Sequence, residues 1–283
     1  MGFYNPTKDS KGVAEGIATL EYVQGVLAEA LLIPGVTCEV NMMNKSKTKV
    51  YRVVKGAVAK TSNLFEDATV TGESSYDDFE VEINKKLSAK VDGEFIPNFS
   101  DAEFDAERWN ILKDQFVIQM NTNFMNLIDA IAPVLTVTGV NTVEKIIEAK
   151  KQIKLASKKT PTTLLCSADA IADIEKLTFF VPNANAVGLQ GEIVGTIKGM
   201  RVVEHPLLDE MGISFVPMHP KWVKLVLINP TKKCVIPGFG DEVSNGLIIR
   251  TTKPENNITQ STTAHMPFGL DILKPEELGV VKI

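Results

Sequence analysis

The residues best suited to catalysis in this sequence are three cysteines and three histidines. A cysteine becomes a nucleophile when a neighbouring histidine takes its proton, and the sequence does not say which of these residues meet in the fold. Cys166 and Cys234 lie within the apolar runs 164–166 and 234–236, where a cysteine typically packs as a small buried hydrophobic residue. Packing is the favoured interpretation, and a Cys/His-dependent enzyme stays as an alternative. The six residues are Cys38, Cys166, Cys234, His205, His219 and His265.

The same residues form no recognisable metal or cofactor motif. Each histidine has a proline within the next two positions, which is typical of a loop, and no two histidines are spaced as a helical ligand pair. Glycines recur between Gly188 and Gly199, but apolar β-type residues flank them and no helix N-terminus follows to hold a phosphate. We therefore expect no catalytic residue, no metal site and no cofactor.

The composition is that of an ordinary globular protein. The 283 residues are 44% hydrophobic, and 35 acidic against 30 basic side chains give a formal net charge of -5. This balance disfavours sequence-independent nucleic-acid binding, which requires a basic surface. No apolar run approaches the roughly 18 residues of a membrane span. The odd number of cysteines and the polar first ten residues indicate a reducing, cytosolic setting.

Charge is segregated between residues 45 and 82. Six basic residues from Lys45 to Lys60 come without an acid among them, and seven acidic residues from Glu66 to Glu82 follow without a base. The two runs can pair within one hairpin, pair between neighbouring copies of the chain, or form a solvated surface. We favour pairing between copies, because acids at every second position of a strand form a row spaced by about 7 Å. The residues expected to make these contacts are Lys45, Lys47, Lys49, Arg52, Asp78, Glu80 and Glu82.

The elements around these charges follow from hydrophobic periodicity. Apolar residues at steps of three and four predict a helix over 15–33, closed by Pro34 and Gly35 and preceded by a polar arm. Residues 36–97 contain short β-type segments, namely 36–42, 49–59 and 79–91. The last alternates apolar and charged residues throughout, which predicts one half-buried antiparallel strand.

A single long helix is predicted next. Ser100 and Glu103 have capping-box spacing, and no proline or glycine interrupts the chain until Pro133. A helix over 101–132 would be about 48 Å long. Its first half is charged, and its second half carries apolar residues at helical spacing, so we expect the second half to be buried. Those residues are Phe116, Met120, Phe124, Leu127, Ile128 and Ile131.

Beyond Pro133 helices and strands interleave. We expect helices over 141–156 and 168–177, a strand over 162–166, two short strands meeting at glycines within 191–203, and further strands over 222–228 and 247–252. The tail from Pro254 is polar and interrupted by prolines, so no element is assigned to it. The pattern as a whole predicts an α+β protein.

This order of elements resembles the major capsid protein family of tailed bacteriophages, whose shell fold is shared with encapsulin nanocompartments. The resemblance is carried by the alternating strand 79–91, by the long helix 104–131, and by the glycine-linked segment 191–203 followed by His205-Pro206-Leu207-Leu208. It implies the α+β Hong Kong-type fold. The implied divisions are an N-terminal arm and helix (1–33), an extended loop (34–97), a peripheral domain with a spine helix (98–133), an axial domain (134–228) and a return to the peripheral domain (229–283).

The resemblance also implies a function. The chain would be the structural subunit of an icosahedral phage head, assembling with itself into hexamers and pentamers around DNA, in the host bacterial cytoplasm and then in the virion. A separate scaffolding protein, a portal and decoration proteins are the further partners that the family implies; no membrane is involved. The alternative within the same fold is an encapsulin-like shell around a protein cargo. Loop lysines are present, but nothing identifies an acceptor, so we predict no covalent crosslink.

Overall fold

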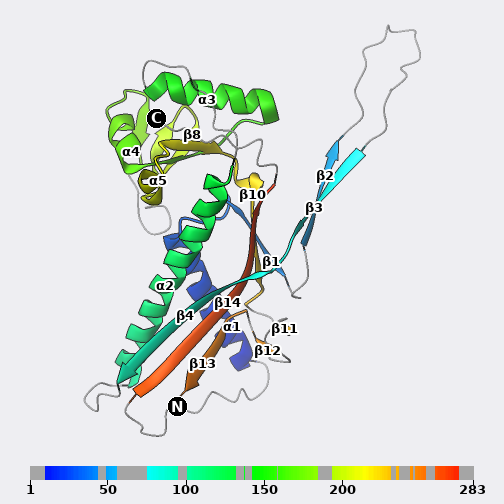
Figure 1. Cartoon of the computed structure of the whole chain (residues 1–283), viewed down its shortest axis with the longest axis vertical. Coiled ribbons are helices and arrows are strands. Elements are labelled where there is room, and N and C mark those ends of the chain that lie inside the picture. The colour runs from blue at the N-terminus through cyan, green and yellow to red at the C-terminus, as the bar shows by residue number, and fades with distance from the viewer. Residues whose placement is uncertain are drawn as a thin grey trace.

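The computed structural model combines a large sheet covered by two long helices, a smaller α/β lobe, and a two-stranded arm that leaves the body (Figure 1). It describes residues 10–43, 49–55, 75–94, 101–131, 137, 142–157, 159–183, 193–230, 234–235, 243–244, 246–252 and 259–273. The helices are α1 (Ser10–Glu29), α2 (Asp101–Asp129), α3 (Thr142–Ser157), α4 (Ala168–Ile174), α5 (Leu207–Glu210) and the 3-10 helix η2 (Pro220–Trp222). The expected mixture of helices and strands is confirmed.

Within the described residues, the strands form two five-stranded sheets and two two-stranded sheets. They are β1 (Glu39–Met43), β2 (Lys49–Lys55), β3 (Ser75–Val81), β4 (Lys85–Glu94), β5 (Thr163–Cys166), β6 (Phe180–Pro182), β7 (Ile193–Ile197), β8 (Met200–Glu204), β9 (Phe215–Met218), β10 (Val223–Ile228), β11 (Cys234–Val235), β12 (Val243–Ser244), β13 (Ile248–Thr252) and β14 (Thr259–Ile272). The main sheet has the order β1-β10-β14-β13, and β4 pairs with β14. β10 falls within the segment 134–228 assigned to the axial domain, but its pairing places it in this sheet.

The central strand of the main sheet is β14, and the sequence analysis missed it. The tail beyond Pro254 looked polar, yet it contains a 14-residue strand. On one side of β14, the pairing with β13 ends at His265 and the pairing with β10 begins at Phe268. Pro267 lies in the gap between them, where its missing N–H costs no bond to either strand. A period of two was present and would have revealed the strand. Its buried members are Thr262, Ala264, Met266, Phe268, Leu270 and Ile272.

The helix α2 confirms the prediction of one long helix after residue 100. It spans Asp101–Asp129 and crosses the main sheet, with its apolar side against the core (Figure 1). Two details differ from expectation. Leu127 is only partly buried, and Arg108, in the charged half, is buried with its Nη1 donating to Thr262 Oγ1 at 3.4 Å. The fully buried side chains of the helix are Leu112, Phe116, Met120, Phe124 and Ile128.

The N-terminal helix is shifted relative to its prediction over 15–33. It begins at Ser10, within the segment expected to be an arm, and ends at Glu29. Leu31 adopts a positive φ of 56°, which breaks the helical path, and the amide of Leu32 then donates to the carbonyl of Leu27. The apolar residues after Glu29 are buried in a turn rather than on the helix.

The alternating segment 79–91 is two strands rather than one. Residues 82–84 interrupt it, so that β3 pairs with β2 in the arm while β4 pairs with β14 in the main sheet. The predicted alternation is otherwise confirmed, because Val81, Leu87, Ala89 and Val91 are buried. The break is what allows the arm to diverge from the body (Figure 1).

The smaller lobe contains the sheet β6-β7-β8-β5-β9. One face of this sheet packs under α3 and α4, through residues such as Leu164 and Phe215. The opposite face, including Leu165 and Val216, belongs to the same core as the main sheet and α2. The lobe is therefore joined to the body through apolar packing at the C-terminal half of α2. None of the helices in the described part of the chain has the length and apolar character that a membrane crossing requires.

Candidate inter-subunit surface

The cysteines are placed for packing. Cys38 and Cys166 are fully buried, and burial raises the pKa of the Cys38 thiol to about 12 and holds the pKa of Cys166 far above its usual range. The thiolate is the reactive form of cysteine, and burial keeps both groups in the thiol form at neutral pH. Cys234 belongs to β11, and its side chain lies outside the described part of the chain.

The three histidines lie in different places and have different surroundings. His219 Nδ1 accepts from the amide of Lys221 and caps η2. His265 Nδ1 lies 3.0 Å from the hydroxyl of Ser88. His205 is buried beside the ring of Phe124, with 6.3 Å between ring centroids. Within the described residues, no group of three or more histidine, cysteine or acidic side chains is arranged to hold a metal ion.

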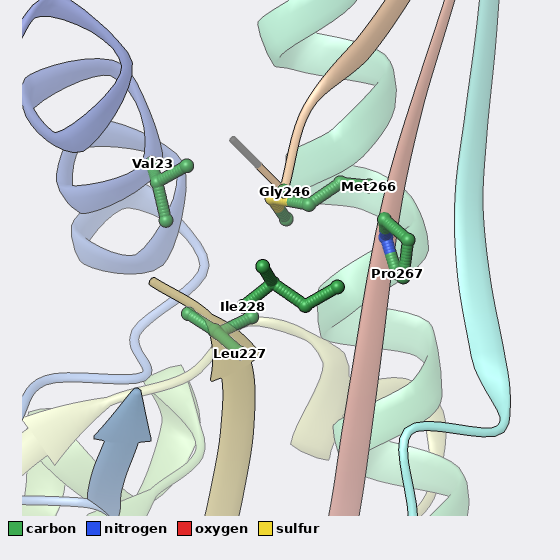
Figure 2. Close-up of a pocket in the computed structure, with 6 residues that line it drawn as sticks. All are labelled: Val23, Leu227, Ile228, Gly246, Met266 and Pro267. Carbon is green, nitrogen blue, oxygen red and sulfur yellow. The ribbon is translucent and has the colours of Figure 1, made fainter. Parts of the chain in front are cut away.

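A small pocket lies between α1 and the main sheet. Figure 2 shows six residues that line it, from α1, β10, β14 and the turn before β13. All of them are apolar and none carries a titratable group, so this pocket has no means of acid–base or nucleophilic chemistry. The lining residues are Val23, Leu227, Ile228, Gly246, Met266 and Pro267. The surface with the most functional character is instead the arm formed by β2 and β3.

The arm is an antiparallel pair, and its described strands carry part of each charge run. Its register places Lys49 opposite Val81, Arg52 opposite Asp78, and Lys55 opposite Ser75. The basic strand therefore lies directly beside the acidic strand over the described part of the arm. Beyond the body, both strands run away from the main sheet and α2 (Figure 1).

Arg52 and Asp78 form an ion pair within the chain. Arg52 Nε and Nη2 donate to the two carboxylate oxygens of Asp78 at 2.8 and 3.0 Å. The hydrogen bond from Arg52 lowers the pKa of Asp78, and the same contact raises the pKa of Arg52. Both side chains are exposed, so this pair orients the two strands more than it stabilises them.

The remaining predicted contact residues have other positions. The ammonium of Lys49 lies 5.9 Å from the ring centroid of Tyr51. Glu80 and Glu82 are exposed, at and just beyond the acidic strand. Lys45 and Lys47 lie outside the described residues. The structure thus brings Arg52 and Asp78 together within one chain, and leaves the contacts expected between chains as a prediction.

The base of the arm is built on a buried lysine that the sequence analysis did not single out. Lys224 of β10 is 5% exposed, and its ammonium bonds to the carboxylate of Glu39 on β1. The ammonium also lies 4.4 Å from the ring centroid of Tyr51 on β2. Burial opposes ionisation of Glu39, but hydrogen bonds from Lys224 and Asn41 outweigh it and its pKa is lowered. A lysine inside the apolar run 222–228 was the available sign of this site.

The second strand of the arm reaches the main sheet at a glycine. A Cβ on Gly269 of β14 would lie 2.1 Å from the carbonyl oxygen of Glu82 and 2.8 Å from its carbonyl carbon. Real Cβ atoms do not approach backbone so closely, so only glycine fits here. Residues 82–84 can therefore cross directly over β14 between β3 and β4.

Comparison by sequence gives nothing: no protein-family model matches this chain, and no curated protein matches it. Comparison by structure gives similarity over most of the chain. A structure from Microbacterium phage Oxtober96 has a TM-score of 0.58 at 11% identity, covering 89% of this chain and 90% of that chain.

Two further structures give the same result. The capsid of the cyanophage P-SCSP1u has a TM-score of 0.55 at 10% identity, covering 87% of this chain and 86% of that chain. The mature capsid of bacteriophage PhiM1 has a TM-score of 0.53 at 13% identity, covering 88% and 85%. The chain has the fold of phage capsid proteins. The resemblance drawn from the order of elements is confirmed at the level of this capsid fold.

Proposed function

We propose that this protein is the major capsid protein of a tailed phage, the subunit of an icosahedral shell that encloses DNA. The observation that carries the proposal is the similarity to phage capsid structures over more than four fifths of both chains. The similar structures come from phages, which favours a phage head over an encapsulin-like compartment. The arm adds support, because strands that leave the body need a neighbour to bury their apolar residues.

The capsid fold suggests which elements form each domain of the subunit. The main sheet with α2 would be the peripheral domain with its spine, β2 and β3 the extended loop, and the smaller lobe the axial domain. The proposed partners are copies of the same chain in hexamers and pentamers, with a separate scaffold, a portal and decoration proteins. The formal charge of -5 fits a container that does not grip its DNA tightly.

Assembly is the direct test of this function. Purified protein, alone and with a co-expressed scaffold from the same genome, should give capsomers or megadalton shells in size-exclusion chromatography with light scattering. Negative-stain microscopy should show closed particles of uniform size. A protein that remains a 31 kDa monomer in both preparations would contradict the shell function.

Charge reversal on the arm tests the contacts between subunits. Glu80→Lys with Glu82→Lys should slow or block assembly, because two lysines in place of the acids would repel the basic row proposed for a neighbour. Lys47→Glu with Lys49→Glu should partly restore assembly in the same chain. The matched control is Glu21→Lys with Glu107→Lys, which makes the same change in net charge at two exposed positions of α1 and α2. Equal assembly of all variants at low and high salt would show that the arm charges are only solvated.

A further inference from the structure

Two contacts hold the base of the arm to the body, one on β2 and one just after the end of β3. On β2 the contact is made by Tyr51, whose ring lies over the ammonium of Lys224. Just after β3, the backbone of Glu82 passes directly over Gly269 of β14. Strands joined by hydrogen bonds behave as one ribbon, so two fixed points at the base define the direction of the whole arm.

The Lys224 contact has the properties of a specific anchor. An ammonium group is rarely buried unless it is paired, and Lys224 is 5% exposed. Its two partners come from two different strands, Glu39 of β1 and Tyr51 of β2. β1 itself is held to β10 in parallel register, with Glu39 beside Lys224. The lysine thus connects the main sheet to the arm through a single buried charge that contacts both.

The position along the arm makes this contact effective. The first pair of the arm is Lys49 with Val81, at its base. Tyr51 pairs with Phe79 two residues farther along. Farther from the base, the described part of the arm extends away from the body (Figure 1). Lys224 therefore holds the base of the ribbon, where a small rotation would produce a large displacement at its far end.

We propose that Lys224 and Tyr51 are positioning residues, which aim the arm at a neighbouring copy of the chain before assembly. The part concerning a neighbouring copy rests on the proposed capsid function. An arm held in one direction reduces the conformational entropy lost when it docks, which strengthens and speeds the contact without adding atoms to the interface.

The direction of the arm can be measured in the isolated subunit by pulsed electron spin resonance. Spin labels carried by unnatural amino acids at Glu80, on β3, and Ile118, an exposed position of α2, report the distance between arm and body. Wild type should give one narrow distance distribution. Lys224→Met and Tyr51→Leu should each widen it at least twofold. Tyr51→Phe should keep it narrow, because the ring over the ammonium is retained.

A second lysine–glutamate pair supplies the control. Lys113 of α2 bonds to Glu29 of α1 within the body, so Lys113→Met removes a lysine–glutamate pair away from the arm and should leave the distribution narrow. Circular dichroism of each variant confirms that the subunit is folded. Narrow distributions for both Lys224→Met and Tyr51→Leu would overturn the anchor.

Assembly kinetics then test the role of the anchor. Lys224→Met should assemble at least several times more slowly than Lys113→Met by light scattering. A widened distribution with unchanged assembly would overturn the positioning role. If wild type forms no shell, the capsid function fails, while the distance measurement still decides whether Lys224 and Tyr51 hold the arm.

Discussion

At the scale of single residues, the buried histidine is the clearest case of a group whose chemistry is set by packing. His205 follows β8, and its amide donates to the carbonyl of Cys166. Its side chain is fully buried, and among the described residues neither ring nitrogen has a hydrogen-bond partner. Burial lowers the pKa of His205 from 6.5 to about 4. The ring is therefore neutral in the folded protein at physiological pH.

This burial predicts a loss of stability in mild acid. Because the unfolded histidine binds its proton at higher pH than the folded one, its contribution is complete above about pH 6.5 and is lost as the pH falls toward 4. We expect the free energy of unfolding to fall by about 2 kcal/mol between pH 7 and pH 5 from this group. Urea denaturation at the two pH values measures it.

The variant His205→Met should make the free energy of unfolding less dependent on pH over this range, since a thioether fills the space without titrating. His219 also has a lowered pKa, through burial and the nearby charges of Lys221, Lys159 and Lys224, and acts in the same direction. His219→Gln is the control that separates the two. An unchanged pH dependence in His205→Met would show that His205 is not the responsible group.

At the scale of elements, the edge of β4 is closed by side chains rather than by another strand. Gln119 of α2 accepts from the amide of Ser88 at 3.1 Å and donates to its carbonyl at 2.7 Å. Gln115 makes the same pair of bonds with Lys90, at 3.1 and 3.2 Å. The four residues from Gln115 to Gln119 rise about 6 Å along the helix, close to the 6.7 Å or so spanned by two strand residues, so the two glutamines meet alternate residues of β4.

Removing one of these glutamine side chains should weaken the protection of the β4 backbone next to it. Gln119→Ala leaves the amide of Ser88 to water, so we expect its hydrogen exchange to become at least tenfold faster by NMR. Because the site is exposed, the free energy of unfolding should fall by only about 1 kcal/mol. Thr122→Ala is the control, since its hydroxyl donates to the carbonyl of Ile118 within the same helix. Equal exchange at Ser88 in both variants would contradict a role in closing the edge.

The close approach of Glu82 to Gly269 predicts that a glycine-to-alanine change destabilises the protein there, whereas the same change in a helix does not. Gly269→Ala must displace the backbone at Glu82, and we expect it to cost roughly 1 to 3 kcal/mol. Gly25→Ala in α1 would meet only the flexible end of Lys113 at 3.3 Å, so it should be neutral or stabilise by up to about 1 kcal/mol. Thermal unfolding compares the two, and equal shifts would contradict the close approach.

Periodicity found most of these elements, and its failures have physical causes. Helix α2 and, in the lobe, α3, α4, β5, β7 and β8 were predicted because their apolar spacing is local to each segment, whereas β6 and β9 of the lobe sheet were not assigned. β14 was missed because polar threonines and Pro267 mask its alternation, and its partners lie far away in sequence. The anchor at Lys224 depends on three strands meeting, and no local pattern encodes such a meeting. The charge runs were visible, but sequence could not show that Arg52 and Asp78 pair within one chain.

At the scale of the whole molecule, one continuous core joins the main sheet, both long helices and the inner face of the lobe. Phe124 lies at this junction, fully buried on α2 and in edge contact with the ring of His205. A shared core of this kind predicts that the body and the lobe unfold in a single transition, since neither can lose its packing without exposing the other.

Truncating this junction should therefore destabilise both parts together. We expect Phe124→Ala to lower the free energy of unfolding by about 3 to 5 kcal/mol through the cavity it leaves. Ile118→Ala, on the exposed side of the same helix at 65% exposure, should change it by less than about 0.5 kcal/mol.

Tryptophan fluorescence reports Trp109 on α2 and Trp222 on η2, and far-ultraviolet circular dichroism reports all helices. Coincident transitions by both probes, shifted together in Phe124→Ala, would support one cooperative unit. Separate transitions would show that the lobe folds independently of the spine.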